Sequence, residues 1–265
     1  MLIDTTPMTL SDVGAGVPVL LLHGGGGPAS VAPFAPRLAE RLGARVLTPT
    51  HPGFAGTERP GGVRTVPQLA SLYARLLDEL GLDDVTVVGN SIGGWVAQEL
   101  GLLGSPRVGR LVLVDSVGVD VPRHPVADFF SLTFPELARL SYHDPERFRI
   151  DPDALPAEAR AVLAANRSAL AVYAGDGMTD PTLLPRLGGI AVPTLVVWGE
   201  DDRIADPDYG QALAEAVPGA RFELLPRTGH LPQLETPDDL ADVVARFALA
   251  GGPGATGRPA AAASA

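Results

Sequence analysis

Short apolar runs alternate with amphipathic segments along most of the chain. Six of these runs are predicted to be β-strands, and they begin at residues 18 (PVLLLHG), 45 (RVLTPT), 85 (VTVVG), 110 (RLVLVD), 193 (PTLVVWG) and 221 (RFELLP). Nearly continuous apolar strands are typical of a parallel sheet with helices on both faces. The pattern predicts an α/β fold built on a doubly wound, mostly parallel sheet of about seven to eight strands.

Helical periodicity fills the intervals between the predicted strands. We expect helices over residues 34–42, 66–80, 95–103, 208–216 and 237–250, the last with Thr236 as its N-cap. Right-handed crossovers place the carboxyl ends of all parallel strands at one edge of the sheet. Ligand sites in open α/β sheets form along that edge, so we expect the functional residues there.

The alternation of predicted strands and helices stops over residues 117–188. Helical segments interrupted by prolines, such as ADFFSLTFPELARLSY, take its place. Such a stretch is too long for a loop. We predict a helical cap over residues 117–188, inserted after the sixth strand and covering the sheet edge, with residues 1–116 and 189–250 as the core. The low-complexity tail 251–265 is expected to be disordered.

Composition narrows the classes of partner and chemistry. The formal net charge of −11 and the lack of a basic run argue against a nucleic-acid partner. The apolar run 17–22 is too short to span a membrane, so we expect a soluble, cytoplasmic protein, either monomer or homodimer. All 20 positive side chains are arginines, which excludes Schiff-base chemistry on lysine. We expect no metal, because no metal-ligand spacing occurs, and no cofactor.

The stretch VVGNSIGGW, residues 87–95, carries the first chemical signal. A serine on a sharp turn from strand to helix is raised above the sheet edge, where it can act as a nucleophile. Gly89 and Gly93 flank Ser91 and allow close backbone packing. The amide of Ile92 points to the same place from the helix N-terminus. We therefore predict Ser91 as nucleophile and the Ile92 amide as an oxyanion donor.

Partners for this serine follow in the expected order of nucleophile, acid and base. Asp202 follows the strand at 193, and His230 lies in the loop after the strand at 221. Asp115 ends another strand and is an alternative acid, although Asp202 is preferred. The glycine run after residue 23 exposes backbone amides, of which we predict Gly25 as the second oxyanion donor.

With these motifs assembled, the chain resembles a capped α/β-hydrolase-fold enzyme from about residue 18 to residue 248. The segments that carry the resemblance are HGGGG, HPGFAGT, GNSIGG, WGEDDRI and GHLPQLETP. The resemblance implies the same roles for Ser91, His230 and Asp202, and the same oxyanion hole from Gly25 and Ile92. It also implies a small-molecule substrate held between core and cap.

The first functional expectation is hydrolysis of a small ester or lactone through an acyl-enzyme on Ser91. An alternative is cleavage of a carbon–carbon bond in a vinylogous diketone, because Asn90, HGGGGP and the cap residue Arg167 resemble the meta-cleavage-product hydrolases. Against this alternative, those enzymes usually have a tryptophan after the catalytic histidine, where this chain has Leu231. A third possibility is a small-molecule receptor that uses the capped pocket.

Candidate substrate-binding residues are proposed around the predicted pocket: Asn90, Phe129, Phe130, Phe134, Arg167 and Leu231. The aromatic residues could instead belong to the core. His23 and His51 each precede a glycine turn and are expected to be structural. His124 and His143 lie in the cap and are expected to be solvated.

Overall fold

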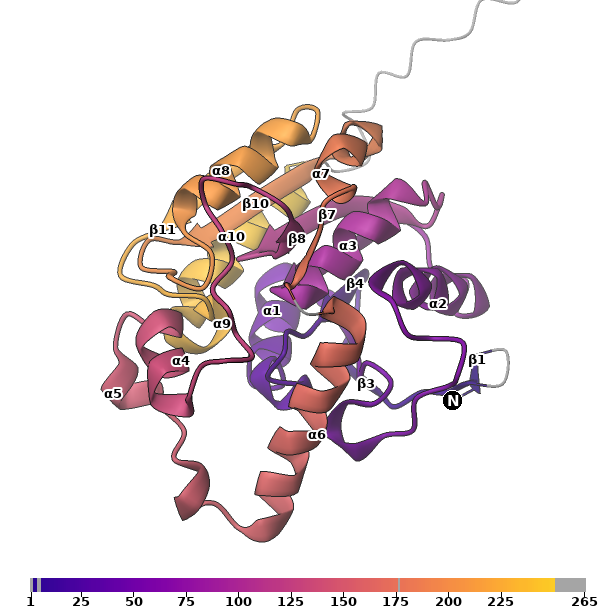
Figure 1. The fold of residues 1–265 in the computed structure, drawn as a ribbon. Helices are drawn as coiled ribbons and strands as arrows, with labels where there is room; N and C mark the ends of the chain where they lie inside the picture. The colour runs from indigo at the N-terminus through magenta and orange to yellow at the C-terminus, as the bar shows by residue number, and fades with distance from the viewer. Residues whose placement is uncertain (1, 4–5, 176, 251–265) are drawn as a thin grey trace, which may run out of the picture.

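The computed structural model describes residues 2–3, 6–175 and 177–250. Its centre is a seven-stranded sheet in the order β11-β10-β7-β6-β4-β5-β3 (Figure 1). The strands are β3 (Leu10–Gly14), β4 (Val17–Leu22), β5 (Ala44–Pro49), β6 (Val85–Asn90), β7 (Val108–Val114), β10 (Thr194–Gly199) and β11 (Arg221–Leu225). All neighbouring pairs are parallel except β3 with β5. The six predicted strands and the mostly parallel sheet are confirmed.

The seventh strand, β3, was not predicted, and it pairs antiparallel with β5 at the sheet edge. Its sequence LSDVG is short and half polar, because only one of its faces packs on the protein. Two further pairs are separate from this sheet: β1 (Leu2–Ile3) with β2 (Thr6–Pro7), and β8 (Gly118–Val119) with β9 (Thr179–Asp180).

The cap was expected over residues 117–188, after the strand predicted from residue 110, and the helices α4 (Phe134–Ser141) to α7 (Leu183–Arg186) lie within that interval. The segment with the cap helices follows β7, which is the fifth strand of the seven-stranded sheet in chain order. The strands β1 and β2 pair only with each other and are not part of the main sheet.

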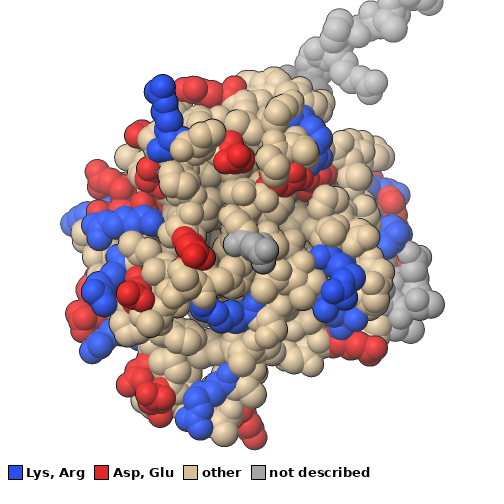
Figure 2. Space-filling view, viewed as in Figure 1, with Lys and Arg blue, Asp and Glu red and all other residues tan. Residues whose placement is uncertain are grey.

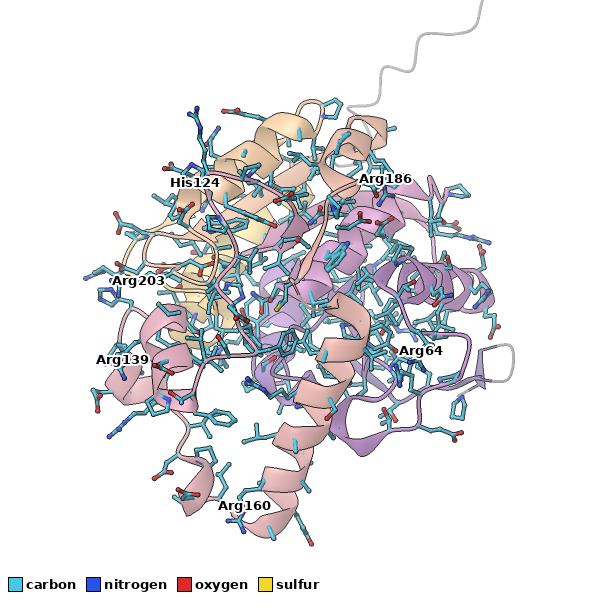
Figure 3. The ribbon with its side chains drawn as sticks, in the orientation of Figure 1. Arg64, His124, Arg139, Arg160, Arg186 and Arg203 are labelled. Atoms are coloured by element: carbon cyan, nitrogen blue, oxygen red, sulfur yellow. The ribbon has the colours of Figure 1, made fainter. Side chains whose placement is uncertain are left out.

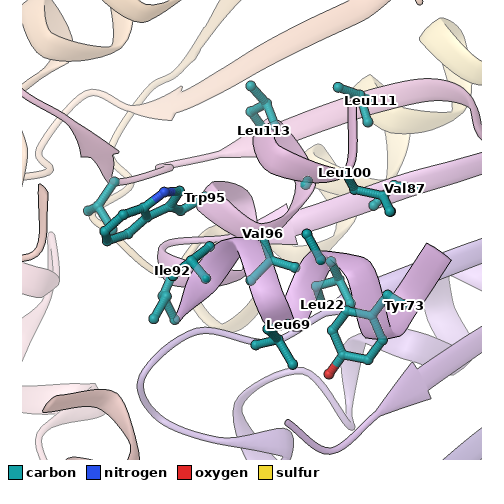
Figure 4. Packing of buried hydrophobic residues seen from close by; sticks show 14 of the residues in the cluster. Leu22, Leu69, Tyr73, Val87, Ile92, Trp95, Val96, Leu100, Leu111 and Leu113 are labelled. Carbon is teal, nitrogen blue, oxygen red and sulfur yellow. The ribbon is translucent and has the colours of Figure 1, made fainter. Parts of the chain in front are cut away.

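Helices cover both faces of the sheet because alternate strand residues point in opposite directions. Leu20 and Leu22 of β4 pack in one hydrophobic cluster, and Val19 and Leu21 pack in the other. The first cluster holds α2 (Val66–Glu79), α3 (Ile92–Leu102) and α8 (Pro207–Ala216), and the second holds α1 (Phe34–Leu42) and α10 (Pro237–Leu249). Figure 4 shows Val96 and Leu100 of α3 among labelled side chains of the strands and of α2, including Leu22, Val87 and Leu69.

One helix begins earlier than predicted, and one predicted N-cap residue makes no capping bond. The helix expected from residue 95 begins at Ile92, because the chain passes from strand to helix at Ser91 with no loop. Gly93 and Gly94 are poor helix formers, so the sequence pattern did not indicate this earlier start. Thr236 does occupy the N-cap position of α10, but its side chain makes no capping hydrogen bond. Its hydroxyl instead pairs with the hydroxyl of Thr228 at 3.0 Å.

The segment between β7 and β10 projects from the sheet edge as two arms (Figure 1). Figure 3 marks them by Arg139 on the first arm and Arg160 at the tip of the second. The helices of this segment are α4 (Phe134–Ser141), α5 (Pro145–Phe148), α6 (Ala157–Ala174) and α7 (Leu183–Arg186). The remaining short elements of the described chain are α9 (Pro232–Glu235) and the 3-10 turns Pro28–Ser30, Phe54–Gly56, Pro152–Ala154 and Leu187–Gly189.

Helix α6 is fastened to the core by two buried side chains. Asn166 donates to the carbonyl of Gly26 at 3.0 Å and accepts from the amide of Ala55 at 2.7 Å. Tyr173 donates to the carbonyl of Pro52 at 2.9 Å. The second arm therefore holds the glycine loop after β4 in place.

Charged side chains of both signs are spread over the face seen in Figure 2. None of the described helices has the length and apolar character needed to cross a membrane. The predicted disorder of residues 251–265 concerns a segment that lies outside the described residues.

Candidate active site

Ser91 occupies the turn between β6 and α3 in a conformation that few non-glycine residues adopt, with φ 57° and ψ −121°. The turn is tight enough to require both flanking glycines. A Cβ on Gly89 would lie 2.2 Å from the carbonyl oxygen of Gly93, and a Cβ on Gly93 would lie 2.4 Å from that of Leu22. The sequence GNSIGG thus folds here as the strained turn that its glycines predict.

His230 and Asp202 meet at the carboxyl edge of the sheet, each in the loop that follows its strand. Their atoms Nδ1 and Oδ2 are 2.7 Å apart, and both side chains are buried. The other carboxylate oxygen of Asp202 accepts from the amides of Ile204 at 2.8 Å and Ala205 at 3.3 Å. These donors stabilise the ionised carboxylate and fix its orientation toward the imidazole.

Asn90 connects the serine turn to the histidine loop. Its side-chain amide donates to the carbonyl of His230 at 3.0 Å and to that of Val114 at 3.3 Å, while its oxygen accepts from Gln233 at 3.0 Å. In the described part of the chain, no hydrogen bond joins the Ser91 hydroxyl to the His230 ring. That contact stays a prediction, and catalytic hydrogen bonds often tighten only when substrate binds.

Asp115, the alternative acid, lies at the end of β7 beside this pair. One carboxyl oxygen each from Asp115 and Asp202 and a ring nitrogen of His230 lie within 4.8 Å of one another. The carboxyl of Asp115, however, accepts from the amide of Gly199 at 2.8 Å, whereas the imidazole bonds to Asp202. Burial, and secondly the charge of Asp202, raise the pKa of Asp115 well above its usual value.

The predicted oxyanion donors flank Ser91 from two elements. Ile92 is the first residue of α3, where backbone amides have no acceptor within the helix. The glycine loop after β4 passes close by, since a Cβ on Gly24 would lie 3.1 Å from the Cβ of Ser91. Gly25 lines the adjoining cavity. Their role as oxyanion donors remains a prediction.

His23 and His51 form a buried network beneath this loop, as expected for structural residues. His51 donates its amide to Nε2 of His23 at 3.0 Å, so Nδ1 of His23 is the protonated nitrogen that donates to the carbonyl of Gly24 at 2.8 Å. The ring of His51 bonds to Tyr73 and to the carbonyl of His23. Burial lowers the pKa of His23 to about 4 and that of His51 well below its usual value.

Two adjoining cavities of about 150 and 450 Å³ lie between the core and the two arms. Their shared lining residues are Gly26, Tyr142, Ile150, Leu163, Asn166 and Leu231. Of the predicted substrate residues, Phe129, Phe134, Arg167 and Leu231 line the smaller cavity. Six further lining residues were not predicted: Leu137, Tyr142, Phe148, Ile150, Leu163 and Asn166. The helical spacing of Leu163 and Asn166 relative to Arg167 was the available signal.

Arg167 is the one charged side chain among the described lining residues of the smaller cavity. Its Nη2 donates to the carbonyls of Phe129 at 3.2 Å and Phe130 at 2.6 Å, and its guanidinium carbon lies 5.4 Å from the Phe129 ring centre. These bonds use Nη2, and among the described residues Nη1 and Nε make no hydrogen bond.

Four residues make contacts that differ from the expected ones. Phe130 is not among the lining residues and packs against Phe129, and the side chain of Asn90 faces the histidine loop and not the cavity. His124, labelled in Figure 3, bonds to Asp206 at 2.9 Å. His143 bonds to Asp201 at 2.6 Å, so both cap histidines are paired with carboxylates at the surface.

The chain is similar to several known proteins. Residues 19–243 match the model of the alpha/beta hydrolase family. The chain is 30% identical over 258 residues to a 2-hydroxy-6-oxo-6-phenylhexa-2,4-dienoate hydrolase from Burkholderia cepacia, covering 86% of each. A meta-cleavage product hydrolase from Pseudomonas fluorescens has a TM-score of 0.72 at 23% identity, covering 93% of this chain and 95% of that one. A thermophilic esterase from Thermogutta terrifontis has a TM-score of 0.69 at 27% identity, with coverages of 91% and 92%.

Proposed function

Because the chain belongs to the alpha/beta hydrolase family, we propose that it hydrolyses a carbon–carbon bond in a 2-hydroxy-6-oxo-dienoate, a vinylogous diketone that carries a carboxylate. The similarity to the dienoate hydrolase favours this reaction over the ester or lactone hydrolysis that the sequence suggested first. The observation that carries the proposal is a single arginine, Arg167, in an otherwise uncharged cavity that is lined by Gly25 of the glycine loop and by Leu231, the residue after His230.

The cavity suits a substrate with one anionic end and an apolar remainder. A carboxylate that enters it can receive Nη1 and Nε of Arg167 as two charge-assisted donors. Phe129, Phe134 and Leu137 provide apolar contact for a conjugated chain. The larger cavity extends toward Ile150 and Val162, where a bulky apolar group at C6 can lie.

The proposed reaction begins with transfer of the enol proton from the C2 oxygen of the substrate to C5, which leaves ketones at C2 and C6. The Ser91 oxygen bonds to C6 while His230 accepts its proton, and the Gly25 and Ile92 amides stabilise the oxyanion. The C5–C6 bond then breaks, and its electron pair moves through the conjugated chain to the C2 oxygen.

The dienolate that leaves takes the proton from His230 and becomes a 2-hydroxypenta-2,4-dienoate. Water, deprotonated by His230, attacks the acyl group on Ser91 and releases a carboxylic acid. Asp202 orients the imidazole and stabilises its protonated form in both halves of the reaction. The net change is the addition of one water across the C5–C6 bond.

Ester hydrolysis is the second candidate, and one residue favours it. Leu231 stands where the meta-cleavage-product hydrolases usually have a tryptophan, and it lines both cavities. The likeness to an esterase at 27% identity adds support for this second reading. The same Ser91 chemistry serves both reactions, since an ester also passes through an acyl-enzyme.

A substrate panel separates the two candidates. Purified protein is assayed with 2-hydroxy-6-oxo-6-phenylhexa-2,4-dienoate, by loss of the dienoate absorbance, and with p-nitrophenyl acetate and butyrate. The proposal predicts a kcat/KM for the dienoate at least about tenfold above that for either ester, because only the dienoate carries the anion for Arg167. Rapid ester hydrolysis with an unchanged dienoate would support the second candidate.

A further inference from the structure

Asp115 is a buried carboxyl group that the proposed reaction does not use. It ends β7 with φ 43°, a conformation that aspartate tolerates better than most residues, and its amide donates to the carbonyl of Val197 at 3.0 Å. The side chain is fully buried, and one oxygen accepts from the amide of Gly199 at 2.8 Å. The other oxygen, Oδ2, has no partner among the described residues.

The ionisable groups around this carboxyl are two acids and a histidine. A carboxyl oxygen of Asp202 and a ring nitrogen of His230 lie within 4.8 Å of a carboxyl oxygen of Asp115, and the charge of Glu235 also acts on it. The carboxylate of Asp202 is tied to two backbone amides and the imidazole. That of Glu235 accepts from the amides of Gly229, His143 and Asp144.

Two carboxyl groups that share a dry site cannot both be ionised at low cost, and the group with fewer donors keeps the proton. Asp202 has the donors that an anion needs, whereas Asp115 has one backbone amide and an oxygen without a partner. A proton on that oxygen supplies the missing hydrogen bond, because it can be donated to a carboxylate oxygen of Asp202.

We propose that Asp115 is a positioning residue that stays protonated and donates its carboxyl proton to Asp202. This inference rests on the proposed roles of Asp202 and His230. The donated bond holds the Asp202 carboxylate and draws negative charge away from the imidazole. His230 must be neutral to accept the proton of Ser91, and a second anion beside it would favour its protonated form. The protonated Asp115 thus keeps His230 available as a base near neutral pH.

The test uses resting protein and needs no substrate. The pKa of His230 is measured by NMR titration in wild type, Asp115→Asn and Asp115→Ala, with His230→Gln to assign the resonance among five histidines. Asparagine keeps a donor toward Asp202 and an acceptor for Gly199, so the pKa should stay within about 0.3 of wild type. Alanine removes the donor, and the pKa should rise by about half a unit to one unit.

Infrared difference spectra between wild type and Asp115→Asn at pH 8 give a second readout if the alanine variant does not fold. A carbonyl band of a protonated carboxylic acid, present in wild type and lost in Asp115→Asn, is the expected result. Its absence, or an unmoved His230 pKa in Asp115→Ala, would overturn the inference.

The kcat/KM values of Asp115→Asn and Asp202→Asn provide a comparison between the two acids. With the best substrate of the panel, Asp115→Asn should keep kcat/KM within about threefold, whereas Asp202→Asn should lose about 10³-fold or more. If Asp115→Asn loses as much as Asp202→Asn, Asp115 is the ionised acid and the inference is wrong. Because the NMR and infrared readouts are independent of turnover, an inactive wild type would contradict only the proposed function.

Discussion

The side-chain amide of Asn90 donates to the backbone carbonyl of His230 at 3.0 Å, across 140 positions of sequence. Asn90 directly precedes the candidate nucleophile, so this bond connects the two loops that must meet for proton transfer. Gln233 holds the oxygen of the same amide at 3.0 Å, which fixes its orientation. The structure therefore connects the serine turn and the histidine loop through the Asn90 amide, although no hydrogen bond joins the side chains of Ser91 and His230 in the described part of the chain.

Replacing Asn90 with alanine should loosen this alignment. We expect kcat to fall about tenfold or more while KM changes less than about threefold, because the reacting groups are displaced but the cavity is intact. The unfolding free energy should also fall by about 1–3 kcal/mol, since buried partners lose their hydrogen bonds. Steady-state kinetics and urea unfolding check both values. Gln211→Ala, an exposed amide on α8, is the control and should change neither. An unchanged kcat in Asn90→Ala would refute the positioning role.

Arg167→Gln tests recognition of a carboxylate. We expect KM for the dienoate to rise by about tenfold to a hundredfold, because charge-assisted hydrogen bonds contribute roughly 1.5–3 kcal/mol. Hydrolysis of an uncharged p-nitrophenyl ester should be little affected. Arg160→Gln, on the exposed tip of the same helix, is the matched control. Equal losses on both substrates would indicate that Arg167 only holds the carbonyls of Phe129 and Phe130.

The buried histidines predict a loss of stability in acid. The pKa of His23 is lowered to about 4 from 6.5. The unfolded chain therefore binds more protons between these values, and the stabilising contribution is full above pH 6.5 and lost as pH falls toward 4. For His23 alone this amounts to about 3 kcal/mol.

Urea unfolding of wild type and His23→Gln between pH 7.5 and 4.5 measures this contribution. The difference in unfolding free energy between wild type and variant gives the contribution of His23 alone. The raised pKa of Asp115 makes stability change with pH in the opposite direction, but it does so equally in both proteins. We expect the variant to be less stable at pH 7.5 and the gap to narrow toward pH 4.5. A gap that does not change with pH would contradict a neutral, buried His23.

The sequence predicted the parts of the site that depend on local chemistry. Glycines at 89 and 93 identify a turn that only they allow, and a parallel sheet brings Asp202 and His230 to one edge whatever the details of the loops. The six buried strands were found because burial on both faces leaves continuous apolar runs.

Features set by distant contacts were missed. The role of Asn90 depends on a carbonyl in another loop, and a residue next to the nucleophile could equally face the substrate. The antiparallel edge strand β3 has a polar face and so lacks a continuous apolar signal. The cavity walls come from two arms whose relative position no local pattern fixes, which is why Tyr142 and Ile150 were not anticipated.

The most direct test of the account is the kcat/KM of Ser91→Ala for 2-hydroxy-6-oxo-6-phenylhexa-2,4-dienoate, relative to wild type and to Ser71→Ala on the surface of α2. We predict that wild type and Ser71→Ala cleave the dienoate equally, and that Ser91→Ala is about 10³-fold slower or more. Circular dichroism should show that all three proteins are folded. Dienoate cleavage by Ser91→Ala at the wild-type rate would contradict the assignment of Ser91 as nucleophile.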